Sequence, residues 1–446
     1  MATRIHSRRL HWGLHLVAGG LLMALAVLPT LFLELAGCWL ALREPLIEAG
    51  CIVILAGFVT YRPRIAKASA GLALGISLFV AGVGVAEGLG RLLRLDFRGA
   101  AAAARRLPPY YRIPTVPTGE VFFRRLGPQQ WRGRVIHRAL RELGIQEDLY
   151  SGEPEITVRY DEHGFRNEPG LRDWELAVCG DSFTELGFLP DELLFTQLLA
   201  QRLGQRVKNL GVSNTGPLTH LHYLKAYGLG PSTRRVAIMF FEGNDLEDLH
   251  GEYQRLRWFE KTGKRPAGRL KRQSSLLRAL GEALVRPATP RPPATVTAAA
   301  AFLELAGKRT PVEFSSAPAA AADIVPEVRE ALEYFVGQYA ALARDHELEA
   351  WLFYLPAKLR VWQGRLHFTE EAPEVIREWQ PTDLPAHLGA LARGRGLRFF
   401  DLTPALIEAT RTQKALLFNP RFDTHLNAAG SAVVAEAMAR ILKPAG

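Results

Sequence analysis

The sequence predicts an α/β protein: a large three-layer domain with a central parallel sheet, preceded by an α-helical transmembrane region. The first observation is that the apolar excess of the 446-residue chain is concentrated in its first 90 residues. The second is that, from residue 151 onward, short apolar runs typical of buried strands alternate with segments of helical spacing. Strands separated by helices indicate a parallel sheet with helices on both faces.

The transmembrane region is predicted to contain about three helices, at residues 13–33, 46–61 and 68–88. The first stretch has no charged side chain and is long enough to cross the hydrocarbon core of a bilayer. The second is short and contains Glu48, so it matches the pattern least well. The third is rich in glycine and alanine, which favours close packing between membrane helices.

The basic residues around these stretches predict their orientation. They precede the first stretch and separate the second from the third: Arg4, Arg8, Arg9, Arg62, Arg64 and Lys67. By the positive-inside rule, the N-terminus is cytoplasmic and the large domain is extracytoplasmic, on the periplasmic side of the inner membrane. If the second stretch does not span the bilayer, the large domain lies in the cytoplasm instead.

Residues 96–150 are predicted to be a basic, proline-containing connector, and residues 151–446 the large domain. Within that domain, residues 250–322 read as an insertion that is partly flexible and partly lid-like. From Glu252 to Arg291 there are eleven Lys and Arg against three Asp and Glu. Such a run is usually solvated surface, and the alternative is a dock for anionic glycan or lipid headgroups.

Composition excludes several classes of protein. The net charge is +10, but nothing in the chain resembles a nucleic-acid-binding module, so no nucleic-acid partner is expected. Three cysteines are too few for a disulfide framework. His220 and His222 have no acidic or cysteine companions at a metal-binding spacing, so neither a metal nor another cofactor is expected.

The large domain is expected to alternate strands with helices. The predicted strands are 174–179, 207–210, 236–241, 349–355 and 397–402. The predicted helices are 191–203, 325–346 and 428–442, with one more at 276–285 inside the insertion. Open parallel sheets place their sites at the carboxyl ends of the strands. Polar residues just past those ends are therefore the first candidates for function.

Ser182 is the candidate nucleophile, because Gly180-Asp181-Ser182 directly follows an apolar strand. Such a turn is common by itself, and a serine hydroxyl is a poor nucleophile unless a correctly oriented base lies within reach. His425 is the candidate base, and Asp423 can accept its Nδ1 proton and leave Nε2 facing the serine. Asp181 is expected to hold the loop around Ser182 and to have no catalytic role.

An oxyanion hole is expected beside the nucleophile. Asn244, in the turn that follows the strand 236–241, can offer its side-chain amide to a developing oxyanion. The backbone N–H groups of Ser182 and Gly211 are expected to join it. The alternative for Asn244 is an ordinary turn residue, since Gly243-Asn244-Asp245 is also a good turn sequence.

Together these residues resemble the SGNH (GDSL-type) hydrolase superfamily over about residues 155–442. The resemblance is carried by four blocks in the right order: Gly180-Asp181-Ser182-Phe183-Thr184-Glu185, Asn209-Leu210-Gly211, Phe241-Glu242-Gly243-Asn244-Asp245 and Asp423-Thr424-His425-Leu426-Asn427. A further segment, Asp161-Glu162-His163-Gly164-Phe165-Arg166, is similar to a Gly-Phe-Arg element in membrane-attached bacterial members. The resemblance implies a flavodoxin-like three-layer domain and serine-dependent ester chemistry.

The last block departs from the common pattern. Many members separate the acid and the base by two residues, whereas only Thr424 lies between Asp423 and His425. The shorter form is similar to that of relatives of alginate O-acetyltransferases. The shorter spacing changes how Asp423 is placed relative to the imidazole, so it concerns the expected role of Asp423 more than that of His425.

The sequence therefore predicts a membrane-anchored serine esterase that cleaves O-acyl or acetyl esters of a cell-envelope glycan or lipid through an acyl-enzyme. One alternative is an O-acyltransferase that modifies an extracytoplasmic polysaccharide, which would need a membrane partner to supply the acyl donor. The other is a non-catalytic glycan-binding protein on the same fold.

Overall fold

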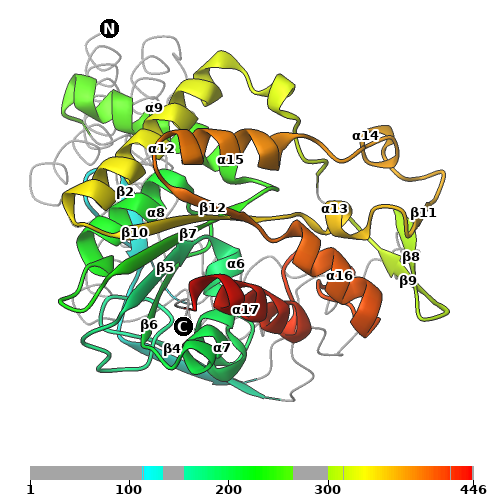
Figure 1. The fold of residues 1–446 in the computed structure, drawn as a ribbon, viewed down its shortest axis with the longest axis horizontal. Coiled ribbons are helices and arrows are strands. Elements are labelled where there is room, and N and C mark those ends of the chain that lie inside the picture. Colours follow the sequence, from blue (N-terminus) through cyan, green and yellow to red (C-terminus); the bar gives the residue numbers. More distant parts are fainter. Residues whose placement is uncertain are drawn as a thin grey trace, which may run out of the picture. The chain divides into compact units, whose positions relative to one another are not determined.

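The computed structural model describes residues 113, 115–133, 155–264, 300–314, 316–421 and 423–443, all within one compact unit. Its centre is a five-stranded parallel sheet in the order β12-β10-β7-β5-β6 (Figure 1). The strands are β5 (Leu176–Gly180), β6 (Val207–Gly211), β7 (Arg235–Phe241), β10 (Glu349–Leu355) and β12 (Arg398–Asp401). Numbered along the chain this is the flavodoxin-like order 2-1-3-4-5, with the switch point between β5 and β7. The predicted sheet is confirmed.

Helices cover both faces of the sheet, as Figure 1 shows. On one face lie α6 (Ser182–Glu185), α7 (Phe195–Leu203), α16 (Thr403–Gln413) and α17 (Ala428–Leu442). On the other lie α8 (Pro217–Tyr223), α9 (Asp245–Thr262), α12 (Pro326–Asp345) and α15 (Leu384–Gly394). Alternate residues of β5 enter the two cores: Leu176 and Val178 one, Ala177 and Cys179 the other. A strand that is buried on both faces is apolar throughout, which is why these strands appear in the sequence as continuous apolar runs.

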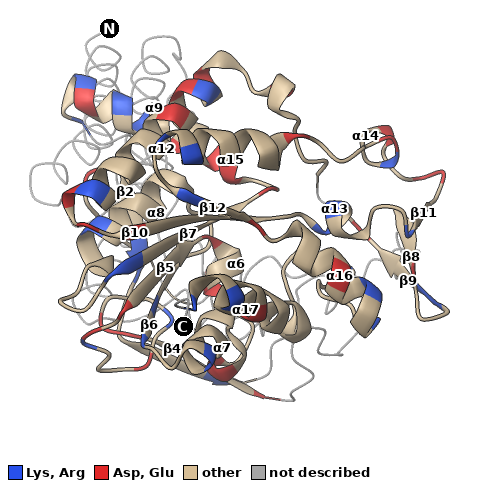
Figure 2. Ribbon diagram, in the orientation of Figure 1, with Lys and Arg blue, Asp and Glu red and all other residues tan. Residues whose placement is uncertain are grey.

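Most charged residues lie in the helices and loops, and few lie within the central strands (Figure 2). Each of the long central strands β7 and β10 carries one charged residue, at its first position, Arg235 and Glu349. The strand and helix predictions for β10 and α17 match the observed bounds. α7 begins later than predicted, because Asp191–Leu193 form a 3₁₀ turn and Leu194 is extended.

The predicted connector is wrong for residues 115–133. These residues form β1 (Thr115–Thr118) and β2 (Phe122–Arg125), an antiparallel pair, and β3 (Gln129–Gly133), which pairs with β4 (Ile156–Tyr160). The side chain of Arg125 is only 4% exposed. This segment therefore belongs to the folded domain. The polar, proline-interrupted texture that suggested a linker is that of short strands outside the central sheet.

The predicted insertion also needs correction at its start. Residues 250–262 continue α9, which packs against α12 in the main body of the domain. Later in the insertion, β8 (Ala301–Leu305) and β9 (Lys308–Val312) form a hairpin, and β11 (Leu366–Phe368) pairs with β8. The predicted helix at 276–285 lies outside the described residues.

Short elements complete the fold. They are the π-helical turn η3 (Leu224–Gly228), the 3₁₀ turn η4 (Ala321–Asp323), α13 (Lys358–Trp362) and α14 (Glu374–Arg377). The predicted membrane spans 13–33, 46–61 and 68–88 lie outside the described residues. Within the part of the chain that is described, no helix combines the length and the apolar character needed to cross a bilayer.

Candidate active site

The turn after β5 places Ser182 at the carboxyl edge of the sheet, as the first residue of α6. Asp181 caps this helix, since its Oδ1 accepts a hydrogen bond from the Phe183 N–H at 2.9 Å. Gly180 is required here, because a Cβ atom would lie 2.1 Å from Thr184 Oγ1. The three residues of the predicted turn therefore have separate local tasks: close approach, capping and presentation of the hydroxyl.

The predicted nucleophile, base and acid are brought together. His425 Nε2 lies 2.7 Å from Ser182 Oγ, and His425 Nδ1 lies 2.9 Å from Asp423 Oδ1. With its hydrogen on Nδ1, the imidazole donates to Asp423 and accepts from Ser182, which is the arrangement that general-base catalysis requires. The single-residue spacing works because Asp423 Oδ1 also accepts the His425 backbone N–H at 2.7 Å.

The electrostatics of His425 favour its protonated form. Burial alone lowers the pKa of an imidazole, but the charge and the hydrogen bond of Asp423 outweigh it and raise the pKa of His425 above 6.5. The carboxylate of Asp181 raises the pKa further. Asp423 and Asp181 therefore stabilise the imidazolium that forms when His425 takes the proton of Ser182.

The catalytic loop, which carries Asp423 and His425 between α16 and α17, is tied by its own hydrogen bonds. Phe418 and Leu426 form an isolated antiparallel bridge, and the Asn419 N–H donates to the His425 carbonyl at 2.9 Å. The Asn419 side-chain amide donates to the same carbonyl at 3.2 Å and to Asp423 Oδ1 at 3.3 Å. The loop therefore holds the acid and the base in a fixed relation to each other.

Two aromatic rings confine the imidazole. The ring centroids of Phe183 and Phe188 lie 4.7 and 5.2 Å from that of His425. Both phenylalanines are buried and follow the nucleophile closely in the chain. The segment that presents Ser182 thus also limits the motion of the base.

Glu185 organises the region behind the nucleophile, and no motif in the sequence pointed to this role. Its fully buried carboxylate accepts hydrogen bonds from Arg125 Nε and Nη2 at 2.9 and 3.0 Å and from the Tyr160 hydroxyl at 2.7 Å. It also accepts from the backbone N–H and the hydroxyl of Ser213, both at 2.5 Å. Burial raises the pKa of a carboxyl, but Arg125 outweighs it, so the pKa of Glu185 lies below its ordinary value. This carboxylate joins β2, β4 and the loop after β6 to α6.

Arg166, from the Gly-Phe-Arg element, holds the segment that follows the nucleophile helix. Its Nη1 donates to the carbonyls of Glu185 and Leu186 at 3.1 and 2.8 Å, and its Nη2 to that of Leu189 at 2.9 Å. The guanidinium also pairs with Asp191 at 2.7 Å. Arg166 therefore holds the backbone of the segment that follows the nucleophile helix.

The prediction that the Gly211 N–H belongs to the oxyanion hole is wrong. This N–H donates to Asn209 Oδ1 at 2.8 Å. A Cβ atom on Gly211 would lie 2.4 Å from the Glu185 backbone nitrogen. Glycine is needed here because β6 and α6 approach closely, and that steric reason accounts for the sequence pattern.

Asn244 lies just past β7 and is the N-cap residue of α9. Its side-chain amide donates one hydrogen to Asp248 Oδ2 at 2.6 Å. This bond fixes the plane of the amide, which carries a second hydrogen. The backbone N–H of Ser182 is the first of α6 and is not needed by the helix itself. Participation of Asn244 and Ser182 in an oxyanion hole stays a prediction.

Two buried carboxyl groups lie behind these residues. Burial raises the pKa of Asp181 to about 6, although the hydrogen bond from Phe183 and the charge of His425 lower it. Asp245 is also buried, its pKa lies well above the ordinary value for the same reason, and its Oδ2 accepts the Phe241 N–H at 2.8 Å. Both side chains cap backbone groups, in agreement with the structural role expected for Asp181.

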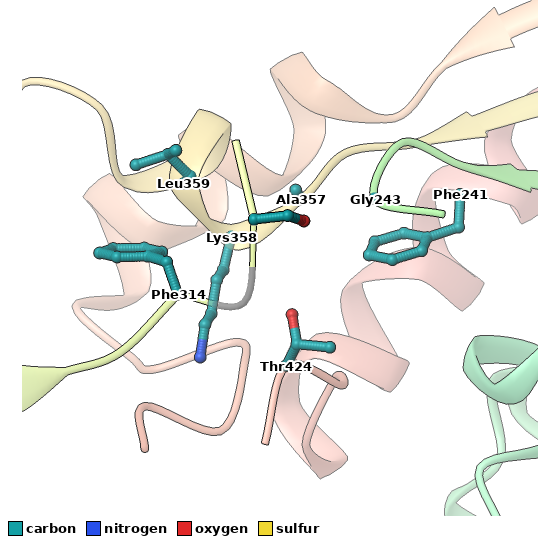
Figure 3. Close-up of a pocket in the computed structure, with 8 residues that line it drawn as sticks. Phe241, Gly243, Phe314, Ala357, Lys358, Leu359 and Thr424 are labelled. Carbon is teal, nitrogen blue, oxygen red and sulfur yellow. The ribbon is translucent and has the colours of Figure 1, made fainter. Parts of the chain in front are cut away.

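A small hollow lies beside the catalytic loop. Figure 3 shows its lining by Phe241, Gly243, Phe314, Ala357, Lys358, Leu359 and Thr424, and Ser316 also contributes. Aromatic and aliphatic groups form most of the wall, and two hydroxyl side chains supply polarity. Thr424, which immediately precedes His425, connects this hollow to the catalytic loop.

His220 and His222 have hydroxyl groups as their neighbours. Burial lowers the pKa of His220 to about 3, and its Nε2 contacts Thr215 Oγ1 at 3.2 Å. His222 contacts Thr118 Oγ1 at 3.0 Å. Across the described ranges, no group of three or more His, Cys, Asp or Glu side chains is placed to hold a metal ion.

The structure places a Ser–His–Asp site at the carboxyl edge of a flavodoxin-like sheet, with the serine in the first block and the Asp–His pair in the last, as the resemblance of the sequence blocks to SGNH-type hydrolases implies. No family model and no curated protein matches the sequence.

Similar solved structures include a protein assigned to the G-D-S-L lipolytic family from Desulfitobacterium hafniense DCB-2, with 13% identity, a TM-score of 0.30 and coverage of 60% of this chain and 99% of that chain. The acetyl xylan esterase AlAXEase has 12% identity, a TM-score of 0.31 and coverage of 60% and 99%. TesA has 16% identity, a TM-score of 0.31 and coverage of 60% and 98%. Similarity at this level gives no information about the activity of this chain.

Proposed function

We propose that this protein is a membrane-anchored serine esterase of the SGNH type, which cleaves an O-acyl ester through an acyl-enzyme. One observation carries the proposal: Ser182 Oγ lies 2.7 Å from an imidazole nitrogen whose partner nitrogen contacts Asp423 at 2.9 Å. A serine that is paired with an oriented base in this way is equipped for attack on a carbonyl carbon.

In the first half of the reaction, Ser182 Oγ attacks the ester carbonyl carbon while its proton moves to His425 Nε2. The oxyanion accepts hydrogen bonds from the Ser182 N–H and the Asn244 amide. Collapse of the tetrahedral intermediate breaks the bond to the alcohol, which takes the proton from His425. Asp423 keeps the imidazole oriented throughout and remains ionised.

In the second half, water attacks the acyl-serine and gives a proton to His425. The second tetrahedral intermediate breaks the bond to Ser182 Oγ, which recovers the proton, and the carboxylic acid leaves. A sugar hydroxyl in place of water would transfer the acyl group instead, so the same residues support an acyltransferase.

The proposed location and substrate class rest on the N-terminal sequence. The three apolar stretches of residues 13–33, 46–61 and 68–88 and the basic residues around them favour an anchor in the inner membrane with the active site on the periplasmic side. An esterase held at that surface would meet O-acylated glycans or lipids of the cell envelope, and we propose these as its substrates.

The test is a burst assay with p-nitrophenyl acetate on the full chain in detergent. A stoichiometric burst of p-nitrophenol is expected, and Ser182→Ala should abolish it. The control is Ser232→Ala, because this hydroxyl is committed to Asp173 at 2.5 Å in a separate turn. An equal burst in Ser182→Ala would overturn the assignment. Added oligosaccharide acceptors would distinguish transfer from hydrolysis by the acylated product.

A further inference from the structure

Lys358 is a buried lysine whose ammonium group donates hydrogen bonds to the catalytic loop. It is the first residue of α13, after the end of β10, and its side chain is 3% exposed. Nζ donates to the carbonyls of Asp423, Asn419 and Pro420 at 2.7, 3.1 and 3.3 Å. Figure 3 shows the side chain leaving its short helix and extending past Phe314 toward the loop that contains Thr424.

The three hydrogen bonds use the full donor capacity of an ammonium group. Aromatic rings lie nearby, with Nζ 5.8 Å from the ring centroid of Phe314 and 6.0 Å from that of Trp362. A buried cation is costly unless it is paired or fully hydrogen-bonded, so this one persists because the carbonyls satisfy it. No N–H remains for a substrate anion. Lys358 thus acts on the loop and has no donor left for a ligand.

The three carbonyls belong to the segment that carries the acid and the base. Asp423 supplies one of them, and the His425 carbonyl is held from the other side by Asn419. The orientation of the Asp423 side chain is therefore set from two directions: by Lys358 on its carbonyl and by the His425 and Asn419 hydrogen bonds on its carboxylate.

We propose that Lys358 is a positioning residue for the Asp423–His425 pair. It fixes the backbone of the catalytic loop so that Nε2 stays within hydrogen-bond reach of Ser182. The proposal rests on the esterase function argued above and adds a residue that lies outside the motif blocks. Small errors in such geometry are expensive, since a displacement of about 1 Å can cost roughly 100-fold in rate.

The charges around Lys358 keep its ammonium group protonated at neutral pH. Burial lowers the pKa of Lys358 to about 8, while the charges of Asp423 and Glu313 raise it. Lys358 also acts on His425, the partner of Asp423: its positive charge lowers the pKa of His425. Loss of a proton from Lys358 would leave two donors for three carbonyls.

The test compares Lys358→Met with Lys208→Met in the full chain. Lys208 is a matched control, because it is equally buried but pairs with Asp161 at 2.5 Å, and Asp161 is outside the catalytic loop. For p-nitrophenyl acetate, Lys358→Met should lower kcat by about 10- to 100-fold and leave KM within about 3-fold. Lys208→Met should lower thermal stability and change kcat per active site, counted by a serine-reactive probe, by less than about 3-fold.

A second variant gives a readout that a purely structural role would not produce. Lys358→Ala leaves a gap beside the hollow, and propylammonium, which matches the four atoms removed, should restore kcat in a saturable way, whereas neutral 1-propanol of the same size should not. Unchanged kcat in Lys358→Met, or equal losses in both lysine variants, would overturn the proposal. Equal rescue by the amine and the alcohol would also overturn it.

A third measurement separates this proposal from the proposed function. The imidazole Nδ1 proton of His425, assigned by its absence in His425→Gln, should give a downfield NMR signal that is protected by Asp423. In Lys358→Met this signal should exchange faster with water, and in Lys208→Met it should not. This result is independent of turnover. If the wild-type chain shows no burst but the Nδ1 signal exchanges faster in Lys358→Met only, the esterase assignment fails. The positioning role of Lys358 is then still supported.

Discussion

Arg125 and Glu185 form a bidentate ion pair in the interior, with Nε–Oε1 and Nη2–Oε2 distances of 2.9 and 3.0 Å. Arg125 ends β2, in a region that precedes the central sheet, and Glu185 ends the short helix that starts with Ser182. The side chains are 4% and 0% exposed. The pair therefore makes the segment before the central sheet a structural part of the nucleophile's support.

Arg125→Met should destabilise the domain strongly, because it leaves the Glu185 carboxylate buried without its cation. Breaking such a pair typically costs about 3–5 kcal/mol. Urea unfolding of the variant measures the loss. Arg132→Ala is the control, since the Arg132–Glu155 pair is 74% and 60% exposed and should contribute little. Similar losses in the two variants would contradict the structural role of Arg125.

The pH dependence of kcat/KM should follow His425. This histidine must be neutral to accept the serine proton, and Asp423 raises its pKa, so activity should fall as pH drops through a midpoint above 6.5. Asp423→Asn removes the charge that raises the pKa and should move the midpoint to lower pH, with a lower plateau. A midpoint that is unchanged in this variant would exclude His425 as the titrating base.

Asn244→Ala should lower kcat for p-nitrophenyl acetate by about 100- to 1000-fold, the usual loss for one oxyanion donor, and should affect KM little. The matched variant is Asp248→Asn, which keeps a side-chain acceptor for the Asn244 amide. It should lower kcat much less than Asn244→Ala does. A small effect of Asn244→Ala would leave this residue as the N-cap of α9 and nothing more.

Gly211→Ala should destabilise the fold, because the added methyl group would lie 2.4 Å from the Glu185 backbone nitrogen. Overpacking against backbone typically costs about 1–3 kcal/mol. Gly394→Ala provides the comparison, since a methyl group added there would meet no atom within 4 Å. Thermal unfolding distinguishes them: Gly211→Ala should melt at a clearly lower temperature, and Gly394→Ala close to the wild type.

The central sheet and the catalytic pair could be predicted from the sequence because both leave local signals. Buried parallel strands such as β7 and β10 are continuous apolar runs, and Ser182 and His425 lie in short blocks next to strand or helix boundaries. The strand order 2-1-3-4-5 follows from the same alternation once the family resemblance is taken into account.

The features that could not be predicted depend on contacts between distant residues. Arg125 and Glu185 are 60 positions apart, and Lys358 reaches a loop 61 to 65 positions away. No sequence periodicity marks such pairs, because a single charged residue in a sequence is usually predicted to lie on the surface. The wrong prediction for Gly211 has a related origin: a glycine needed for close packing and one that offers its N–H look alike in sequence.

Ser182 and His425 are 243 positions apart, near the two ends of the part of the chain that forms the central sheet. Ser182 belongs to the first strand–helix unit of the sheet, whereas His425 lies just before the final helix α17. During synthesis, the nucleophile is thus made long before its base, and the serine stays unreactive until the last segment of the chain docks. Recovery of serine reactivity during refolding would therefore report completion of the whole domain, because no smaller piece contains both partners.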